Sequence, residues 1–302
     1  MMYIEKIDYN NNLFGDNIGF IENWDFSRAN INDESRIEAI TTVASICYDN
    51  DKIIGKKSLY DRLYAESNGL PSSSFEFVPV LIHFEDYVAI NEAVFQNQKK
   101  PGEISVLNIE KYGEFIHESG KIFVITNLRA MLNDYETHRE TFESHSMDLR
   151  QYYNSESQSK IIAKYYKTFR IKMDMATSKQ FIRHRSQNLQ ELSRRYVSAE
   201  KTPFEFYISK KIRNSNVYND VLNHIANSVE LYNNMRKCGI SPQESRRVIP
   251  QNAYTTIWSA WQPEGIKNFI KLRTDAHAQW EIRQIAQEME KWIKSCDNVT
   301  PM

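Results

Sequence analysis

The chain has 302 residues, of which 41% are hydrophobic and 25% are charged, as in ordinary soluble globular proteins. Its 38 basic and 39 acidic residues nearly cancel, so no global field attracts nucleic acid or an anionic membrane surface. The N-terminal stretch lacks a basic segment followed by an apolar one, and no apolar run is long enough to cross a bilayer. We therefore expect a cytoplasmic protein with one domain over residues 1–302, without a nucleic-acid or membrane partner.

The cysteine pattern gives no sign of a metal or a redox centre. Cys47, Cys238 and Cys296 lie far apart in the chain and form no CxxC pair. Such spacing argues against a zinc site, a redox dithiol and a disulfide framework. We expect three reduced thiols and no bound metal.

The first half of the chain begins with helical patterns and ends in a segment without a chemical motif. Apolar residues recur at helical spacing from Arg36, at Ile37, Ile40, Ala44 and Cys47. A second helix is expected from Leu59 to Ala65, and a strand from Phe75 to Ile82, where Pro79 indicates an edge or a bulge. Residues 83–167 are polar and aromatic, and we interpret them as an insertion.

The second half is more regular. Phe169, Ile171 and Met173 alternate with polar residues, which predicts a half-buried strand, and a helix follows from about Ala176. Two amphipathic helices follow, one that ends at Gly239 and one at the C-terminus. Their apolar stripes are Leu222, Ile225, Val229 and Tyr232 in the first, and Ala278, Ile282, Ile285, Met289, Trp292 and Ile293 in the second. Between them, Ser241-Pro-Gln-Glu244 predicts a capping box that begins a short helix with Arg246.

The densest chemical signal is the segment from Gln180 to Tyr196, which holds four arginines, one histidine and two serines. On a helix, Gln180, Arg183 and His184 share one face. The polar stretch from Ser186 to Leu192 is expected to leave this helix and return Ser193 and Arg195 toward the same place. Guanidinium groups bind phosphate bidentately and serine hydroxyls complete such a cradle, so the segment predicts a phosphate-ester site. A solvated, arginine-rich helix face is the alternative interpretation.

The spacing from Arg183 to Ser193, Arg-His-Arg with a serine after seven further residues, resembles the signature of the flavin-dependent thymidylate synthases, the ThyX family. Three later blocks resemble the same family in the same order: Phe204–Ile208, Glu244–Pro250 with Tyr254-Thr255, and Leu272–Arg283. The resemblance covers residues 168–295, and more weakly 36–82.

This resemblance implies an α+β fold, with a mainly antiparallel sheet flanked by helices and with active sites at the subunit interfaces of a homotetramer. It implies conversion of dUMP to dTMP, with methylenetetrahydrofolate as carbon donor and NADPH-reduced FAD as reductant. No cysteine is needed as a nucleophile in this chemistry.

Residue roles are also implied by the resemblance. For dUMP, the implied ligands are Gln180, Glu191, Ser193, Arg195, Arg246 and Arg273. Of these, Arg273 and Ser193 are the catalytic candidates, since a guanidinium beside the pyrimidine stabilises the charge that develops on the ring. The implied FAD ligands are Arg183, His184, Arg185, Asn268 and His277.

The chain departs from the family pattern at two places. The family has two histidines in Gly-His-x-x-Pro-Phe-Glu-His, whereas Leu70, Pro71 and Phe77 stand in the matching segment here. Gln262 and Glu264 stand where the family often has asparagine and arginine near the flavin.

These departures leave open a diverged relative that modifies another pyrimidine nucleotide or uses another one-carbon donor. A non-enzymatic nucleotide- or RNA-binding module is a further alternative. The stretch from Ser259 to Pro263 is similar to part of the cysteine-dependent thymidylate synthase, but the Pro-Cys-His nucleophile of that enzyme is missing. The folate site is not located.

Overall fold

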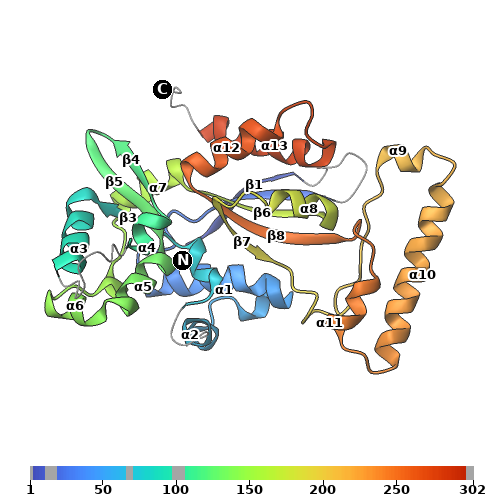
Figure 1. The fold of residues 1–302 in the computed structure, drawn as a ribbon, viewed down its shortest axis with the longest axis horizontal. Helices are drawn as coiled ribbons and strands as arrows, with labels where there is room; N and C mark the ends of the chain where they lie inside the picture. Colours follow the sequence, from blue (N-terminus) through green and yellow to red (C-terminus); the bar gives the residue numbers. More distant parts are fainter. Residues whose placement is uncertain (1–2, 11–18, 66–70, 97–105, 297–302) are drawn as a thin grey trace.

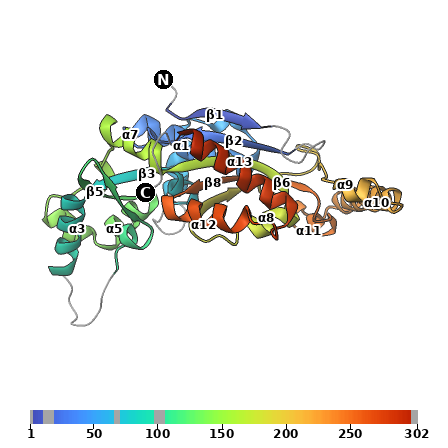
Figure 2. The ribbon, with the colours of Figure 1, turned by 90° about the horizontal axis from the view of Figure 1, so that it is seen from above.

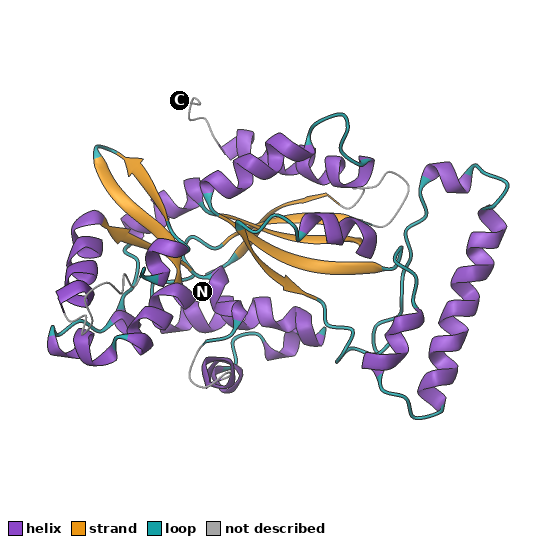
Figure 3. Ribbon diagram, in the orientation of Figure 1, coloured by secondary structure: helices purple, strands orange, loops and turns teal. Residues whose placement is uncertain are grey.

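The computed structural model describes residues 3–10, 19–65, 71–96 and 106–296, so Gly69 and Leu70 lie outside it. The described chain is α+β, with two antiparallel sheets flanked by helices, as expected from the sequence (Figure 3). No helix of the described residues is long and apolar enough to span a membrane.

The larger sheet has the strand order β1–β2–β6–β8–β7 and carries the site described below. Its strands are β1 (Glu5–Asn10), β2 (Phe20–Asp25), β6 (Lys167–Asp174), β7 (Gln187–Glu191) and β8 (Tyr254–Trp261). In β6 the residues Phe169, Ile171 and Met173 are fully buried, which confirms the predicted alternation. Asp174, a polar residue at the end of this strand, is buried as well, because its carboxylate accepts hydrogen bonds from the first turn of the next helix.

Helices cover both faces of this sheet (Figures 1 and 2). Helices α12 and α13 lie on one face beside α8, and α1 lies on the other. The α-helices are α1 (Asp33–Tyr48), α2 (Lys57–Ala65), α3 (Phe84–Gln96), α4 (Asn108–Lys111), α5 (Leu128–Thr137), α6 (Arg139–Ser144), α7 (Glu156–Tyr165), α8 (Met175–Phe181), α9 (Lys210–Arg213), α10 (Tyr218–Lys237), α11 (Pro242–Ser245), α12 (Pro263–Arg273) and α13 (Trp280–Cys296). The predicted C-terminal stripe is confirmed, since Ile282, Ile285 and Met289 of α13 pack into the sheet core.

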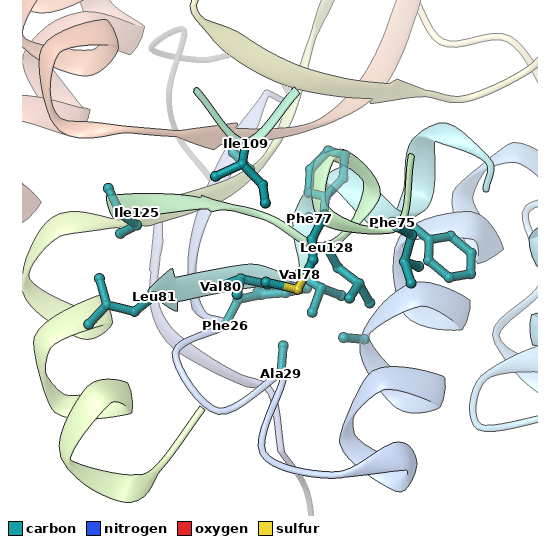
Figure 4. Close-up of a cluster of buried hydrophobic side chains, with 14 of the residues drawn as sticks. Phe26, Ala29, Phe75, Phe77, Val78, Val80, Leu81, Ile109, Ile125 and Leu128 are labelled. Carbon is teal, nitrogen blue, oxygen red and sulfur yellow. The ribbon is translucent and has the colours of Figure 1, made fainter. Parts of the chain in front are cut away.

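The smaller sheet has the order β3–β5–β4, with β3 (Pro79–His83), β4 (Glu114–Glu118) and β5 (Lys121–Asn127). Pro79 is the first residue of edge strand β3, where its missing N–H removes no ladder bond. The expected strand start at Phe75 is wrong, because Ser73–Phe77 is a 3₁₀ turn. Figure 4 shows the core between this sheet and α1, with side chains that include Phe26, Ala29, Phe75, Phe77, Val78, Val80, Leu81, Ile109, Ile125 and Leu128.

Helix α10 stands apart from both sheets, at one end of the molecule (Figure 2). Gly239 follows it with φ of 81°, the left-handed cap that the sequence predicts. Of its expected apolar stripe only Tyr232 is buried, whereas Leu222 is 39% exposed. The block Phe204–Ile208 forms one isolated antiparallel bridge, between Phe206 and Ala253.

Candidate functional site

The turn after α8 carries the first predicted site residues. Helix α8 ends at Phe181, so Arg183 and His184 lie in the turn that follows and not on the helix face expected from the sequence. The ring of His184 packs edge-on against Phe269 of α12 at 4.9 Å between centroids. This contact holds the imidazole in a buried position.

His184 meets Arg273, the last residue of α12. The Arg273 Nε donates to His184 Nε2 at 2.9 Å, and its Nη2 approaches the carbonyl oxygen of Gln180 at 3.5 Å. Burial and the adjacent guanidinium charge lower the pKa of His184. The imidazole is therefore neutral at physiological pH, with Nε2 as the acceptor and the proton on Nδ1. We call Gln180, His184 and Arg273 the Arg273–His184 cluster.

A second group of predicted residues follows β7. The hydroxyl of Thr255 donates to Glu191 Oε1 at 2.7 Å, at the end of the strand. Desolvation raises the pKa of Glu191, while this hydrogen bond and the charge of Arg246 act in the opposite direction. Ser193 comes two residues later, where its carbonyl accepts from the N–H groups of a turn.

Two arginines complete this second group. The Arg195 Nε donates to Gln243 Oε1 of α11 at 3.0 Å, and Arg246 follows the same short helix. Both side chains are exposed. Neither forms an ion pair with a carboxylate of the described residues. We call Glu191, Ser193, Arg195 and Arg246 the Arg195–Arg246 cluster.

The two clusters lie at opposite ends of β7. This strand pairs with β8 from Gln187 opposite Trp261 to Glu191 opposite Ile257. At about 3.3 Å per residue, its length separates the clusters by roughly 15 Å. The expectation that residues 186–192 return the chain to the helix is therefore wrong, since an extended strand carries Ser193 and Arg195 away from it.

The predicted flavin ligands other than His184 are exposed. Arg183, Arg185 and Asn268 lie on the surface near the helical layer, and none forms an ion pair within the described chain. The side chain of His277 is 97% exposed, and its backbone N–H and Nδ1 both approach Asp275 Oδ1, at 2.8 and 2.9 Å. Two unpaired guanidinium groups beside a turn suit an anionic cofactor.

The N-terminus of α12 has no free N–H groups for an anionic cofactor. Its first N–H groups are taken by Glu114 of β4, which accepts from Glu264 N at 2.9 Å and from Gly265 N. The side-chain amide of Gln262 donates to the carbonyl of Tyr112. Gly265 is required here, because a Cβ would lie 2.4 Å from the carbonyl oxygen of Ser186. The residues present thus fit a cofactor on the Arg183 and Arg185 side, and not at this helix end.

Sequence reasoning missed several of these contacts. Gln243 falls in the expected capping box, but Ser241 makes no side-chain cap and Glu244 pairs with Arg247 instead, so the box is not formed. Glu114 lies in the segment that carried no motif. Thr255 belongs to the Tyr254-Thr255 block that resembles the family. This resemblance was the one feature of the sequence that pointed to its role.

Neither metal ligands nor reactive thiols gather at the site. Within the described residues no three His, Cys, Asp or Glu side chains could hold a metal ion together. Cys47 of α1 lies against β7, where the Nε2 of Gln190 donates to its sulfur at 2.7 Å. Cys238 is exposed beyond α10, and the side chain of Cys296 lies outside the described residues.

Comparison with known families gives a match over the C-terminal part of the chain. Residues 120–298 match the model of the Thy1 family, described as thymidylate synthase complementing protein. The matched range begins inside residues 83–167, so part of that segment belongs to the family domain. Whether the remainder is an insertion stays a prediction.

Individual relatives share about a third of the aligned residues. The flavin-dependent thymidylate synthase of Thermotoga neapolitana is 32% identical over 131 residues, which are 41% of this chain and 59% of that protein. The enzyme of the same name from Pseudothermotoga lettingae is 33% identical over 139 residues, 42% of this chain and 61% of the relative. The chain thus spans less than two thirds of these relatives. A solved UMP/dUMP methylase, PolB from Streptomyces cacaoi bound with 5-Br UMP, is 23% identical, with a TM-score of 0.39 over 43% of this chain and 68% of the other.

Proposed function

We propose, because the chain belongs to the Thy1 family of thymidylate synthase complementing proteins, that it is a flavin-dependent thymidylate synthase. In this proposal it converts dUMP to dTMP, with methylenetetrahydrofolate as carbon donor, NADPH as the source of electrons and FAD as the bound cofactor. A cytoplasmic location is part of the same proposal.

The observation that carries this proposal is an excess of unpaired positive charge. Arg183, Arg185, Arg195, Arg246 and Arg273 form no ion pair with a carboxylate of the described residues. Most surface arginines elsewhere in the described chain do have such partners, for example Arg129 with Glu76 and Arg247 with Glu244. Guanidinium groups without internal counter-ions suit a dianionic nucleotide and an anionic dinucleotide cofactor.

The two clusters suit the two ends of dUMP. Arg195, Arg246 and the hydroxyl of Ser193 would hold the phosphate. Arg273 would lie against the uracil ring, where its charge stabilises the anion that forms as C5 becomes nucleophilic. The neutral His184 fixes the guanidinium orientation by accepting from Nε, which leaves Nη1 and the second N–H of Nη2 for the ring oxygens.

The redox chemistry would be supplied by FAD when bound, and the protein contributes orientation and charge. Arg183 and Arg185 would hold its phosphates, with Asn268 and His277 as the further ligands implied by the family.

A homotetramer is part of the proposal. The 15 Å separation means that one chain does not gather both clusters around a single uracil nucleotide. Apolar side chains are also exposed along helix α10. Leu231 is 49% exposed, and Val217, the residue before the helix, is 46% exposed. A second copy that covers this helix would bury them and would bring clusters from two chains together.

The closed N-terminus of α12 favours a second candidate function, a diverged relative that methylates another pyrimidine nucleotide. Glu264 and Glu114 place two carboxylates where the family often has one arginine. This alternative keeps both clusters and changes the substrate or the donor. A nucleotide- or RNA-binding module without catalysis is the remaining alternative.

The test is an absorption spectrum of the purified protein followed by a turnover assay. We expect a flavin spectrum after addition of FAD, and dTMP from dUMP, NADPH and methylenetetrahydrofolate. Flavin binding with methylation of another pyrimidine nucleotide would select the diverged enzyme. Protein that binds no flavin and forms no methylated nucleotide would contradict both enzymatic proposals.

A further inference from the structure

A hollow of about 510 Å³ lies at the N-terminus of α1, between α2 and the chain around residue 150. Six of its lining residues matter here, namely Asp33, Arg36, Tyr60, Asp61, Arg150 and Tyr153. It is remote from the Arg195–Arg246 cluster, because Cys47, near the other end of α1, contacts Gln190 of β7, and the Arg273–His184 cluster lies on the face of the sheet opposite α1 (Figures 1 and 2). Fourteen residues of helix, at about 1.5 Å each, place the two ends roughly 20 Å apart. No role described above uses this hollow.

Arg36 is the unusual group in its wall. The side chain is only 3% exposed, yet it forms no ion pair with a carboxylate of the described residues. Its Nε, Nη1 and Nη2 donate to Asn30 Oδ1 and to the carbonyls of Arg150 and Tyr152. A guanidinium has five N–H groups, so two donors are left over. Burial lowers the pKa of Arg36, although the nearby tyrosines and Asp33 oppose this.

Aromatic rings line the hollow beside Arg36. Tyr60 stacks against Tyr64 with centroids 6.4 Å apart, and Phe75 packs under both rings at 5.3 and 5.9 Å. Burial raises the pKa of Tyr60 to about 12, so its hydroxyl stays protonated, and it has no hydrogen-bond partner among the described residues. Tyr153 lies on the opposite side, with its ring 4.1 Å from the Arg36 guanidinium. The hollow thus offers rigid aromatic faces with unused donors.

The charges around the hollow are balanced. Asp61 pairs with Lys57 at 2.6 Å, and Arg150 pairs with Asp148 at 2.8 Å. Asp33 remains beside Arg36 as an acceptor, and its Oδ1 takes a hydrogen bond from the Tyr153 hydroxyl at 2.7 Å. A strongly anionic ligand gains little from such a site. The hollow suits a neutral, planar ring that carries hydrogen-bond acceptors next to a donor.

We propose that this hollow is a second ligand site, which binds the base of a nucleoside. The base would stack on Tyr60, accept hydrogen bonds from the spare Arg36 N–H groups and the Tyr60 hydroxyl, and donate one to Asp33. Stacking between a base and a tyrosine ring is how proteins commonly hold unpaired bases, and the volume is that of an ordinary small-molecule pocket. The site is independent of the reaction proposed for the arginine clusters.

The test measures binding of thymidine and adenosine to the full chain by calorimetry, with dUMP present at saturation to fill any site in the arginine clusters. We expect saturable binding of at least one nucleoside. Tyr60→Leu should weaken it at least about fivefold, the loss typical of one stacking contact. Asp33→Asn, at an exposed position, should weaken it about tenfold, because the amide keeps a single acceptor oxygen and the Tyr153 hydroxyl already donates to one oxygen of Asp33. Tyr112→Leu, at a tyrosine outside the hollow, is the matched control and should change nothing.

Three results would overturn the proposal. One is the absence of saturable binding by either nucleoside. Another is unchanged affinity in both Tyr60→Leu and Asp33→Asn, each checked for native unfolding behaviour. The third is loss of binding in Arg195→Ala, which would place the nucleoside in the phosphate cradle. None of these outcomes depends on flavin binding or turnover, so this proposal can fail while the enzymatic one stands.

Discussion

The two arginine clusters differ in how far one chain completes them. In the Arg273–His184 cluster the guanidinium is held at 2.9 Å by a buried, neutral histidine, and Phe269 packs against the imidazole. In the Arg195–Arg246 cluster both guanidinium groups are exposed, and Gln243 is the one side chain of the described residues that holds Arg195 through a hydrogen bond. The first is preorganised by packing within one chain, while the guanidinium groups of the second lie exposed on the surface.

This difference suggests a division of labour. A rigid donor aimed at a developing charge lowers an activation barrier, because no reorganisation is needed during the reaction. A pair of exposed cations suits capture of a phosphate, where each contact adds binding energy.

Removal of Arg273 should affect turnover most. Arg273→Ala is expected to lower dTMP formation per flavin-loaded subunit by about 10²–10³, the usual loss for one such donor. Arg273→Lys should recover little, because lysine lacks the planar fork. Arg283→Ala is the matched control, since Arg283 lies in the neighbouring helix and donates to a backbone carbonyl. Full activity of Arg273→Ala would remove its catalytic role.

Changes in the second cluster should act on affinity. Arg195→Ala or Arg246→Ala is expected to weaken dUMP binding roughly ten- to hundredfold, because a charge-assisted hydrogen bond contributes about 1.5–3 kcal/mol. FAD binding should be largely retained. Arg247→Ala serves as control, since this neighbour is exposed and paired with Glu244. Equal affinities of the wild type for dUMP and deoxyuridine would show that no phosphate cradle exists.

The neutral state of His184 should be visible as a pH dependence of stability. Its pKa is lowered in the folded protein, so below the unfolded value of about 6.5 the unfolded chain binds a proton that the folded chain does not. The free energy of unfolding should fall as the pH drops through that value, by at most about 1.4 kcal/mol per pH unit. His184→Gln should lose this part of the slope in denaturant titrations. An identical slope in both proteins would contradict a neutral His184.

Glu114 should stabilise α12 modestly. Glu114→Ala removes the acceptor for two N–H groups at the helix start, which typically costs about 0.5–2 kcal/mol of unfolding free energy. Glu118→Ala, on the same strand but paired with Lys164, should cost no more than about 1 kcal/mol. Because α12 ends in Arg273, the loss should disturb turnover more than dUMP affinity. Equal losses of turnover and of dUMP affinity would contradict the proposed division of roles between the two clusters.

The cysteines should matter least. Joint replacement of Cys47, Cys238 and Cys296 by alanine or serine is expected to leave most activity, since no enzyme thiol attacks the uracil ring in the proposed reaction. A small loss is expected at Cys47, whose sulfur accepts from Gln190 beside the second cluster. Complete inactivation of a folded, flavin-binding variant would revive a cysteine nucleophile.

The spacing of apolar residues predicted elements with one buried face, such as β6 and α13. In these elements the buried residues alternate or recur at helical spacing, and this pattern is visible in the sequence. Prediction failed where long-range contacts decide the structure. The direction of residues 186–192 depends on pairing with β8, and the cap on α12 comes from Glu114, 150 residues away. Local patterns carry no record of either contact. The capping box at Ser241 failed for a local reason instead, since Glu244 pairs with Arg247 three residues later.

The central claim, that an active site joins one cluster from each of two chains, is tested most directly by mixing two variants that are both inactive at a dUMP concentration far below the weakened Kd of Arg195→Ala. Arg273→Ala and Arg195→Ala subunits would be co-expressed with different tags, the mixed oligomers isolated, and dTMP formation measured per flavin. The account predicts that part of the activity returns, because a mixed interface can pair an intact Arg273 with an intact Arg195. Mixed oligomers that bind flavin and remain as inactive as either parent would contradict it.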